Sequence, residues 1–135
     1  LTGGADPELA DEIASSPEIV ATGFVSDAEK AAIVRHATVM VNPSHLESLS
    51  LLMLEAMASR VPVLVNGRSE VMADHCRRSG AALAYGGRDF LRKLRRLLSS
   101  PQLRRELGEK GPAYVREQYG WEVIIPKLRH LIDSL

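Results

Sequence analysis

Cysteine, charge of one sign and long apolar runs are scarce or absent in this sequence. Cys76 is the one cysteine among 135 residues, so the chain cannot form a disulfide with itself, and a reducing compartment suits it. Lysine plus arginine and aspartate plus glutamate number 17 each, and this balance leaves no net charge to attract nucleic acid. We find no signal peptide and no apolar run that could span a bilayer, and we therefore expect a cytoplasmic protein.

The sequence also lacks several motifs of catalytic and metal-binding sites. A P-loop, a G-x-G-x-x-G turn and a nucleophile elbow are all missing. The four histidines show no metal-ligand spacing with one another or with Cys76: His36, His45, His75 and His130. The residue pattern therefore gives no reason to expect a metal ion.

Short β-prone runs alternate with amphipathic helical patterns along the first two thirds of the chain. The runs are "EIVATGFV" (18–25), "ATVMVNP" (37–43), "VPVLVNG" (61–67) and "AALAYGG" (81–87). This alternation is typical of repeated βα units, whose parallel strands are covered on both faces and are apolar throughout. The sequence therefore predicts an α/β fold with a doubly wound parallel sheet, in one domain over residues 1–135.

Capping residues place the helix boundaries. Asp6 followed by Pro7 predicts the start of a first helix that ends near residue 15, and Ser26 with Glu29 forms the S-x-x-E capping box of a second helix. After residue 87 the strand pattern stops, and we expect a helical C-terminal tail. Its three helices are predicted at about 88–99, 101–117 and 121–134.

The stretch "SHLESLSLLMLEAMASR" (44–60) predicts a helix that is apolar on all sides and yet contains a glutamate. Every residue from Leu49 to Ala58 is apolar except Ser50 and Glu55. The loop before this helix is expected at the carboxyl ends of the strands, the edge at which such sheets bind ligands where strand order reverses. Three loops are predicted there: 23–26, 42–50 and 66–69. The first helical turn has unpaired N–H groups that suit a phosphate.

Two glutamates, Glu47 and Glu55, stand on either side of this helix start. The helical part of the gap between them spans roughly 10 Å at about 1.5 Å per residue. A nucleotide-sugar has a matching form, with hydroxyl groups on both sides of a diphosphate, and carboxylates accept hydrogen bonds from hydroxyls. Alternatively, Glu55 is structural and pairs with a buried arginine or lysine. His45, in the same loop, is a further candidate for contact with the donor.

The segment "VNPSHLESLSLLMLEAMASRVPVLV" (41–65) resembles the motif of the family 4 retaining glycosyltransferases, the group 1 family. Its pattern P-S-x-x-E-(S/G)-(F/L)-(G/S)-L-x-x-x-E-A-M-A matches residues 43–58, and the E-x7-E spacing is kept. Residues 17–44 look like the preceding strand-helix-strand of that family, and residues 119–135 look like its closing tryptophan-bearing helix. The resemblance implies the C-terminal, Rossmann-like half of a GT-B enzyme, which binds a nucleoside-diphosphate sugar and transfers its glycosyl group with retention.

The resemblance also implies roles for individual residues. Glu47 would bind the hydroxyls of the donor sugar as the catalytic residue, and Glu55 would bind the ribose. Together with His45, the expected donor-site residues are Gly23, Phe24, Val25, Glu47, Ser48, Leu49, Ser50 and Glu55. The amides of Leu49 and Ser50 would hold the diphosphate, and Gly23 to Val25 would lie near the base. No metal or other cofactor is expected, because such enzymes stabilise the leaving diphosphate with a helix dipole and cationic side chains.

The sequence departs from the family pattern in two ways. Arg60 stands where the family usually has glycine, which predicts a modified turn and looser packing before the strand at 62–65. The phosphate-binding arginine and lysine of the family precede residue 1, so we expect a fragment without its first βα unit and without the N-terminal acceptor domain, inactive by itself. The rival interpretations are a sugar-nucleotide epimerase or phosphorylase on the same fold, and a non-catalytic Rossmann-like module.

Cationic residues gather over residues 92–105. Leu91, Leu94, Leu97 and Leu98 predict one apolar helical stripe with the cations on the other side. A solvated helix face is the preferred interpretation, because no exposed aromatics accompany the cations, and contact with anionic lipid at the inner membrane face is the alternative.

Overall fold

The structure is a computed structural model that describes residues 7–135. The chain divides into two compact units, and each is described by itself. The first unit ends at Ile33 and the second begins at Val34. The first unit contains helix α1 (Pro7–Ser15) and most of helix α2 (Asp27–His36). The expected N-cap Asp6 lies outside the described residues.

The predicted capping box begins α2. The Ser26 N–H donates to Glu29 Oε2 at 2.9 Å, and the Glu29 N–H donates to Ser26 Oγ at 3.3 Å. The Ser26 hydroxyl also donates to Glu29 Oε2, and these hydrogen bonds lower the pKa of the Glu29 carboxyl. The two residues thus satisfy backbone groups at the start of the helix, as their spacing predicts.

The strand expected at 18–25 is not formed. Within residues 7–135 the sheet contains three strands, and all of them follow residue 39. Gly23 adopts φ +63°, a left-handed conformation that an extended strand cannot contain. Val20 is 69% exposed, so the apolar side of this run is not covered as a sheet strand would be. The prediction failed because β-propensity describes side chains and not the pairing edge that a strand needs.

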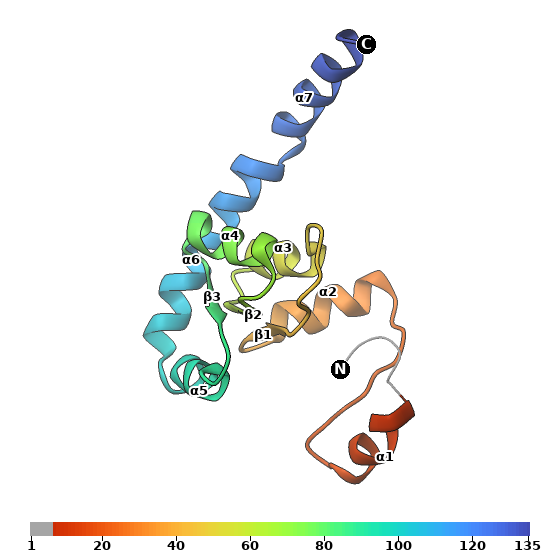
Figure 1. The fold of residues 1–135 in the computed structure, drawn as a ribbon, viewed down its shortest axis with the longest axis vertical. Helices are drawn as coiled ribbons and strands as arrows, with labels where there is room; N and C mark the ends of the chain where they lie inside the picture. Colours follow the sequence, from red (N-terminus) through yellow and green to blue (C-terminus); the bar gives the residue numbers. More distant parts are fainter. Residues whose placement is uncertain (1–6) are drawn as a thin grey trace. The chain divides into compact units, whose positions relative to one another are not determined.

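The second unit is built on a parallel sheet of β1 (Met40–Asn42), β2 (Val63–Asn66) and β3 (Ala82–Tyr85) (Figure 1). The strand order follows the chain, and the register aligns Val41 with Leu64 and Leu64 with Leu83. Helices α3 (Leu51–Ala58) and α4 (Glu70–Ser79) connect the strands. The described sheet therefore has its carboxyl ends on one edge but contains no reversal of strand order.

Both faces of this sheet are covered, which explains its continuously apolar central strand. Val63 and Val65 pack on one side, in a cluster that includes Met53 of α3 and Met72 of α4. Leu64 packs on the other side, against helices α5 (Phe90–Ser99) and α6 (Pro101–Tyr119). Successive side chains of a strand point to opposite faces, so β2 contributes to both clusters. The α/β fold predicted from the sequence is confirmed.

The helical C-terminal tail is also confirmed. After α5 and α6 follows α7 (Trp121–Asp133), and Gly120, in an extended conformation, separates the last two helices. The Ser100 hydroxyl accepts a hydrogen bond from the Leu103 N–H at 3.2 Å and so caps α6. Helix α7 has no buried residue, and Trp121 is 75% exposed.

The turn after α3 is closed by an arginine in a conformation that favours glycine. Arg60 has φ +61°, its N–H donates to the Met57 carbonyl at 3.1 Å, and the Val61 N–H donates to the Ala56 carbonyl at 2.9 Å. This is the Schellman arrangement, in which the left-handed residue is usually glycine. The expectation of a modified turn is therefore wrong, because Arg60 adopts the ordinary turn at the cost of backbone strain.

Packing at this corner is close. Gly108 of α6 lies against the Arg60 carbonyl and Gly111 lies against the Met57 carbonyl, so that a Cβ at either glycine would collide with the backbone of the turn. The prediction of looser packing at Arg60 is therefore wrong, because these two glycines on the facing helix let the backbones approach closely.

Candidate functional site

The predicted ligand edge is organised by an asparagine at the end of β1. The Asn42 side-chain amide nitrogen donates to Ser50 Oγ at 2.9 Å and to Glu47 Oε1 at 3.2 Å, and its carbonyl oxygen accepts from the Ser44 N–H at 3.0 Å. Asn42 is buried. A single side chain therefore fixes three points of the loop that leads from β1 to α3.

A second asparagine holds the loop from β2. Asn66, the last residue of that strand, donates from its side-chain amide to the Pro43 carbonyl at 2.9 Å. Ser44 folds the next part of the loop, because its hydroxyl donates to the Leu46 carbonyl at 2.9 Å. The loop is thus tied to the carboxyl ends of two neighbouring strands before it reaches the helix.

Glu47 is half-buried and directed by Asn42, whereas Ser50 directly precedes α3 in a left-handed conformation with φ 56° and ψ 70°. The Ser50 hydroxyl makes no capping hydrogen bond to the helix, because it accepts from Asn42 instead. The structure therefore brings together Glu47, Ser50 and the first turn of α3. Such a turn presents backbone N–H groups and the positive end of the helix dipole to an anion.

Glu55 lies one turn into α3 on the side of the helix that is open to solvent. Leu51 is 66% exposed, Glu55 is half-exposed, and Ala58 is exposed, and these positions share one helical face. The opposite face is the buried one: Met53, Leu54, Ala56 and Met57. The expectation of a helix buried on all sides is wrong, and the carboxylate carries no cost of deep burial.

The remaining predicted residues fall in two places. His45 and Ser48 are exposed in the loop before α3, and Leu49 is half-buried against the core. Gly23, Phe24 and Val25 belong to the first compact unit, where Phe24 is 93% exposed.

Sequence reasoning missed Asn42 and Asn66. Each is the last residue of a strand and is followed by a turn residue, in "VNP" and "VNG". An amide with both donor and acceptor atoms at the carboxyl end of a parallel strand can hold the loop that follows, and this position was the available signal. Because the predicted loops were assigned by position alone, the residues that hold them were overlooked.

A cavity of about 440 Å³ adjoins this loop. Its lining includes Ser48 and Leu49 of the loop, Glu70 and His75 of α4, and Tyr119 of α6. The predicted diphosphate segment thus has open space beside it, bounded by the helix that follows β2.

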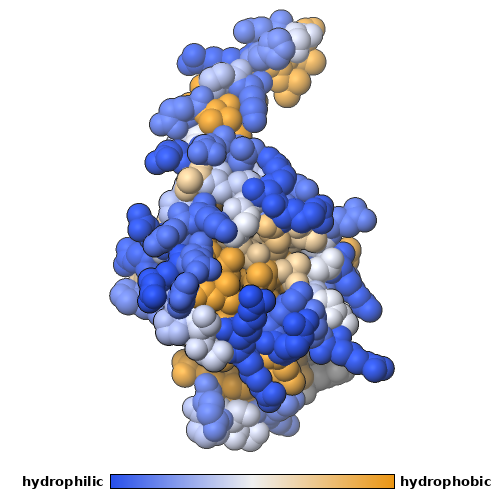
Figure 2. All heavy atoms as spheres, turned by 90° about the vertical axis from the view of Figure 1, so that its left-hand side faces the viewer, coloured by the Kyte–Doolittle hydropathy of each residue, from blue (hydrophilic) through white to orange (hydrophobic). Residues whose placement is uncertain are grey.

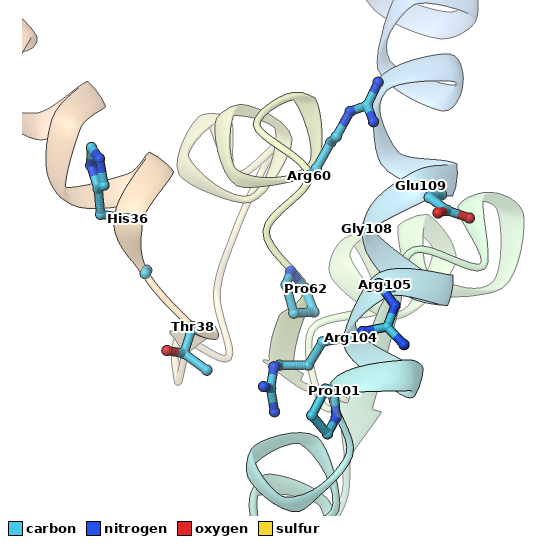
Figure 3. A pocket seen from close by; sticks show the side chains of 10 residues that line it. His36, Thr38, Arg60, Pro62, Pro101, Arg104, Arg105, Gly108 and Glu109 are labelled. Atoms are coloured by element: carbon cyan, nitrogen blue, oxygen red, sulfur yellow. The ribbon is translucent and has the colours of Figure 1, made fainter.

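A larger cavity of about 540 Å³ lies at the opposite edge of the sheet, beside Thr38 and Pro62, which precede β1 and β2. Arg104 donates from Nη1 to the carbonyls of Leu97 and Leu98 at 2.7 and 2.8 Å, and so completes the end of α5. In Figure 3 the Arg104 guanidinium points toward Thr38, whereas Arg60 and Arg105 point in other directions. The cations do not converge on one ligand position, so we place the site at the carboxyl edge despite the larger volume here.

In residues 7–135 no three side chains of His, Cys, Asp or Glu gather closely enough to hold a metal ion. The expectation of an enzyme without metal or cofactor stays a prediction.

Comparison with known proteins identifies the family. The family model described as "Glycosyl transferases group 1" matches residues 1–100. A D-inositol 3-phosphate glycosyltransferase of Streptomyces bingchenggensis is 36% identical over 92 residues, which are 65% of this chain and 20% of that protein. An MMP alpha-(1->4)-mannosyltransferase of Mycolicibacterium hassiacum is 29% identical over 124 residues, 90% of this chain and 30% of that protein.

A third relative, the Glycosyltransferase 1 domain-containing protein 1 of Xenopus tropicalis, is 26% identical over 114 residues, 82% of this chain and 32% of that protein. The chain spans between about a fifth and a third of the length of these curated relatives. Since the family model covers well over half of its residues, the chain belongs to the group 1 glycosyl transferases.

Proposed function

We propose that this chain is the donor-binding part of a glycosyltransferase that moves a glycosyl group from a nucleoside-diphosphate sugar to an acceptor hydroxyl with retention. One observation carries the proposal: Asn42 fixes Glu47 and Ser50 together at the start of α3, while Glu55 projects from the solvent-open face of the same helix. Two carboxylates thereby stand on either side of a helix N-terminus that suits a diphosphate.

Each group has a role that matches its chemistry. The amides of Leu49 and Ser50 and the dipole of α3 would take the diphosphate, and Ser48 would lie against it. Glu55 is four residues beyond Leu51, or about 6 Å along the helix axis, and would accept hydrogen bonds from the ribose hydroxyls. Glu47 would accept from hydroxyls of the sugar, beside His45.

The names of the relatives support a glycosyl-transfer reaction. Two of them are named for glycosyl and mannosyl transfer. Because this chain matches less than a third of each of those two proteins, we assign the acceptor site, and transfer itself, to the full protein, in which an N-terminal acceptor domain would be the partner. Stabilisation of the departing diphosphate by the helix dipole would be the contribution of the donor part.

The test is calorimetric titration of the full-length protein with UDP, GDP and ADP, in the wild type and in Glu55→Gln. We expect one nucleotide to bind and its affinity to fall about tenfold in Glu55→Gln, since hydrogen bonds to a charged carboxylate are lost. Glu117→Gln, an exposed position on α6, is the matched control and should bind as the wild type.

Two results would contradict the proposal. A folded protein that binds none of the three nucleotides would be a non-catalytic module. Unchanged affinity in Glu55→Gln, together with a large loss of stability, would make Glu55 a structural residue. The cytoplasmic location expected from the sequence stays a prediction.

We further propose that α5 contacts an anionic membrane surface. Residues 88–105 contain seven lysines and arginines and one aspartate, a net charge of +6 in a chain of net charge zero. The predicted leucine stripe lies along one side of α5, where Leu94 and Leu97 pack toward the core, while Leu91 and Leu98 at its margin are 58% and 52% exposed. Figure 2, which views the side of α5 and α6, shows mainly hydrophilic side chains with small hydrophobic patches between them. Exposed leucines among cations fit an anionic lipid surface, and no helix within residues 7–135 is long and apolar enough to cross the bilayer.

A further inference from the structure

His75 of α4 is a buried histidine that none of the proposed roles uses. Its side chain is 3% exposed, and its Nδ1 lies 2.7 Å from the Tyr114 hydroxyl of α6. The ring also contacts Tyr119 edge-on, with 5.7 Å between ring centroids. These contacts fix the imidazole against α6 on one side, so that its position is set independently of any ligand.

The other ring nitrogen of His75 lacks a hydrogen-bond partner in the described part of the chain. Nε2 is buried and makes no hydrogen bond to any residue that the structure describes. A buried polar atom without a partner costs free energy, and such atoms are rare enough to need a reason. Because Nδ1 is already held by Tyr114, the ring cannot turn to satisfy Nε2 without losing that bond.

The surroundings of His75 show what its free side faces. His75, Ser48 and Leu49 line the same cavity of about 440 Å³. Burial is the largest of the causes that lower the pKa of His75, whereas the backbone of Leu49 raises this pKa. The backbone of Leu49 therefore lies close enough to the imidazole to act on it as a hydrogen-bond acceptor.

The protonation of this pair follows from burial. The lowered pKa keeps His75 neutral near pH 7, with one N–H, and burial raises the pKa of Tyr114 to about 12, so the phenol keeps its proton. When the Tyr114 hydroxyl donates to Nδ1, the single imidazole proton resides on Nε2. Nε2 is then a buried donor without an acceptor among the described residues, in a ring on which the Leu49 backbone acts.

The Leu49 carbonyl and the Ser50 N–H belong to one peptide group. A trans peptide is planar, and its C=O and N–H point in opposite directions. A donor bonded to the Leu49 carbonyl therefore lies on the side of the peptide opposite the Ser50 N–H and fixes the direction of that N–H. The same hydrogen bond polarises the peptide, so that the N–H donates more strongly. On the far side, Asn42 already fixes Ser50 through its hydroxyl.

We propose that His75 is a positioning residue for the donor diphosphate: Nε2–H donates to the Leu49 carbonyl when the Ser50 N–H takes a phosphate oxygen. The inference rests on the proposed function. It extends the site to α4 and α6, because the Tyr114–His75 pair then joins α6 to the peptide that contacts the ligand. His75 itself does not touch the nucleotide.

Two substitutions of similar shape separate this role from a purely structural one. The terminal amide of glutamine reaches the place of Nε2, whereas the amide of asparagine reaches only the place of Nδ1. In the full-length protein we expect His75→Asn to bind the preferred nucleotide among UDP, GDP and ADP about tenfold more weakly, and His75→Gln to stay within about threefold of the wild type. Urea unfolding of both variants measures their stability in parallel.

The outcomes are distinguishable. Wild-type nucleotide affinity in His75→Asn would overturn the inference. Equal weakening of binding in both variants, with equal loss of stability, would also overturn it. In either case, weaker nucleotide binding in Glu55→Gln would still support the donor site. Failure of the wild type to bind any of the three nucleotides would overturn the proposed function and this inference with it. Weakening confined to His75→Asn, at matched stability, would establish the positioning role.

Discussion

The side-chain amide of Asn42 donates a 2.9 Å hydrogen bond to the hydroxyl of Ser50, eight residues along the chain, and both side chains are buried. The bond turns the serine hydroxyl away from the capping position that serine usually takes at a helix start. The first turn of α3 is thereby left without a serine cap, and the same amide also donates to Glu47 Oε1.

Asn42→Asp should damage the site while keeping its shape. The carboxylate cannot donate to Ser50 or Glu47, and it adds a negative charge beside Glu47. We expect about tenfold weaker nucleotide binding and a free energy of unfolding lower by about 1–3 kcal/mol, measured by calorimetry and by urea titration. Gln102→Glu makes the same amide-to-acid change on the exposed surface of α6. If Asn42→Asp behaves like that control, the asparagine does not organise the site.

Arg60→Gly should stabilise the protein. Arg60 occupies a left-handed conformation with φ +61° and its side chain is exposed, so its removal relieves backbone strain and gives up little packing. We expect the free energy of unfolding to rise by about 1 kcal/mol in urea titration. Arg60→Ala keeps the Cβ and therefore the strain, and it should gain nothing. An equal gain in the alanine variant would assign the effect to the arginine side chain and not to the backbone.

The buried His75 should make stability depend on pH. Burial and then the nearby charge of Arg78 lower its pKa, while Asp74 and the Leu49 backbone oppose them. The unfolded chain therefore binds a proton more readily, so the stabilising contribution is complete above the ordinary pKa of 6.5 and is lost as the pH falls through the lower folded pKa.

We expect the free energy of unfolding of the wild type to fall in urea titrations as the pH is lowered from 7 through the ordinary histidine pKa of 6.5, because the unfolded state then binds more protons than the folded state. His75→Gln should show a smaller fall. His130→Gln, at an exposed position of α7, should keep the wild-type slope. An unchanged slope in His75→Gln would mean that another group controls the acid sensitivity.

Apolar runs and capping residues predicted most of the second unit. The run 61–67 contains β2, and Ser100-Pro101 and Gly120 correctly marked the ends of α6, because these signals depend on local sequence. The run 18–25 failed because the chain at Gly23 takes a left-handed conformation that composition does not reveal. An apolar run therefore indicated a strand only where a neighbouring strand of the sheet paired with it.

Predicting the candidate site depended on a different kind of information. Glu47 and Glu55 could be found from their spacing, since eight residues across a loop and a helix is a local relationship. Asn42 and Asn66 act through contacts between a strand end and a loop, and His75 acts across 39 residues through Tyr114. Such contacts depend on strand register and helix packing, which the sequence pattern does not contain.

The membrane proposal predicts salt-sensitive binding to anionic vesicles. Leu91, Arg95 and Leu98 share the exposed face of α5, so the leucines can enter the lipid interface while the cation meets anionic headgroups. We expect the full-length protein to float with vesicles that contain phosphatidylserine and not with phosphatidylcholine alone. Raising the salt from 0.01 to 1 M should release it, because the Debye length falls from about 30 to about 3 Å.

The double variant Leu91→Ser with Leu98→Ser tests whether these side chains enter the lipid. Vesicle binding should fall several-fold, since each leucine contributes about 1.5–3 kcal/mol when fully buried and less at an interface. Leu9→Ser, on α1 at 50% exposure, is the control and should bind as the wild type. Vesicle binding that resists high salt, or that survives the double variant unchanged, would show that another surface makes the contact. Since Leu94 and Leu97 of the same helix pack against the sheet, a bound α5 would hold the β3 side of the fold against the bilayer.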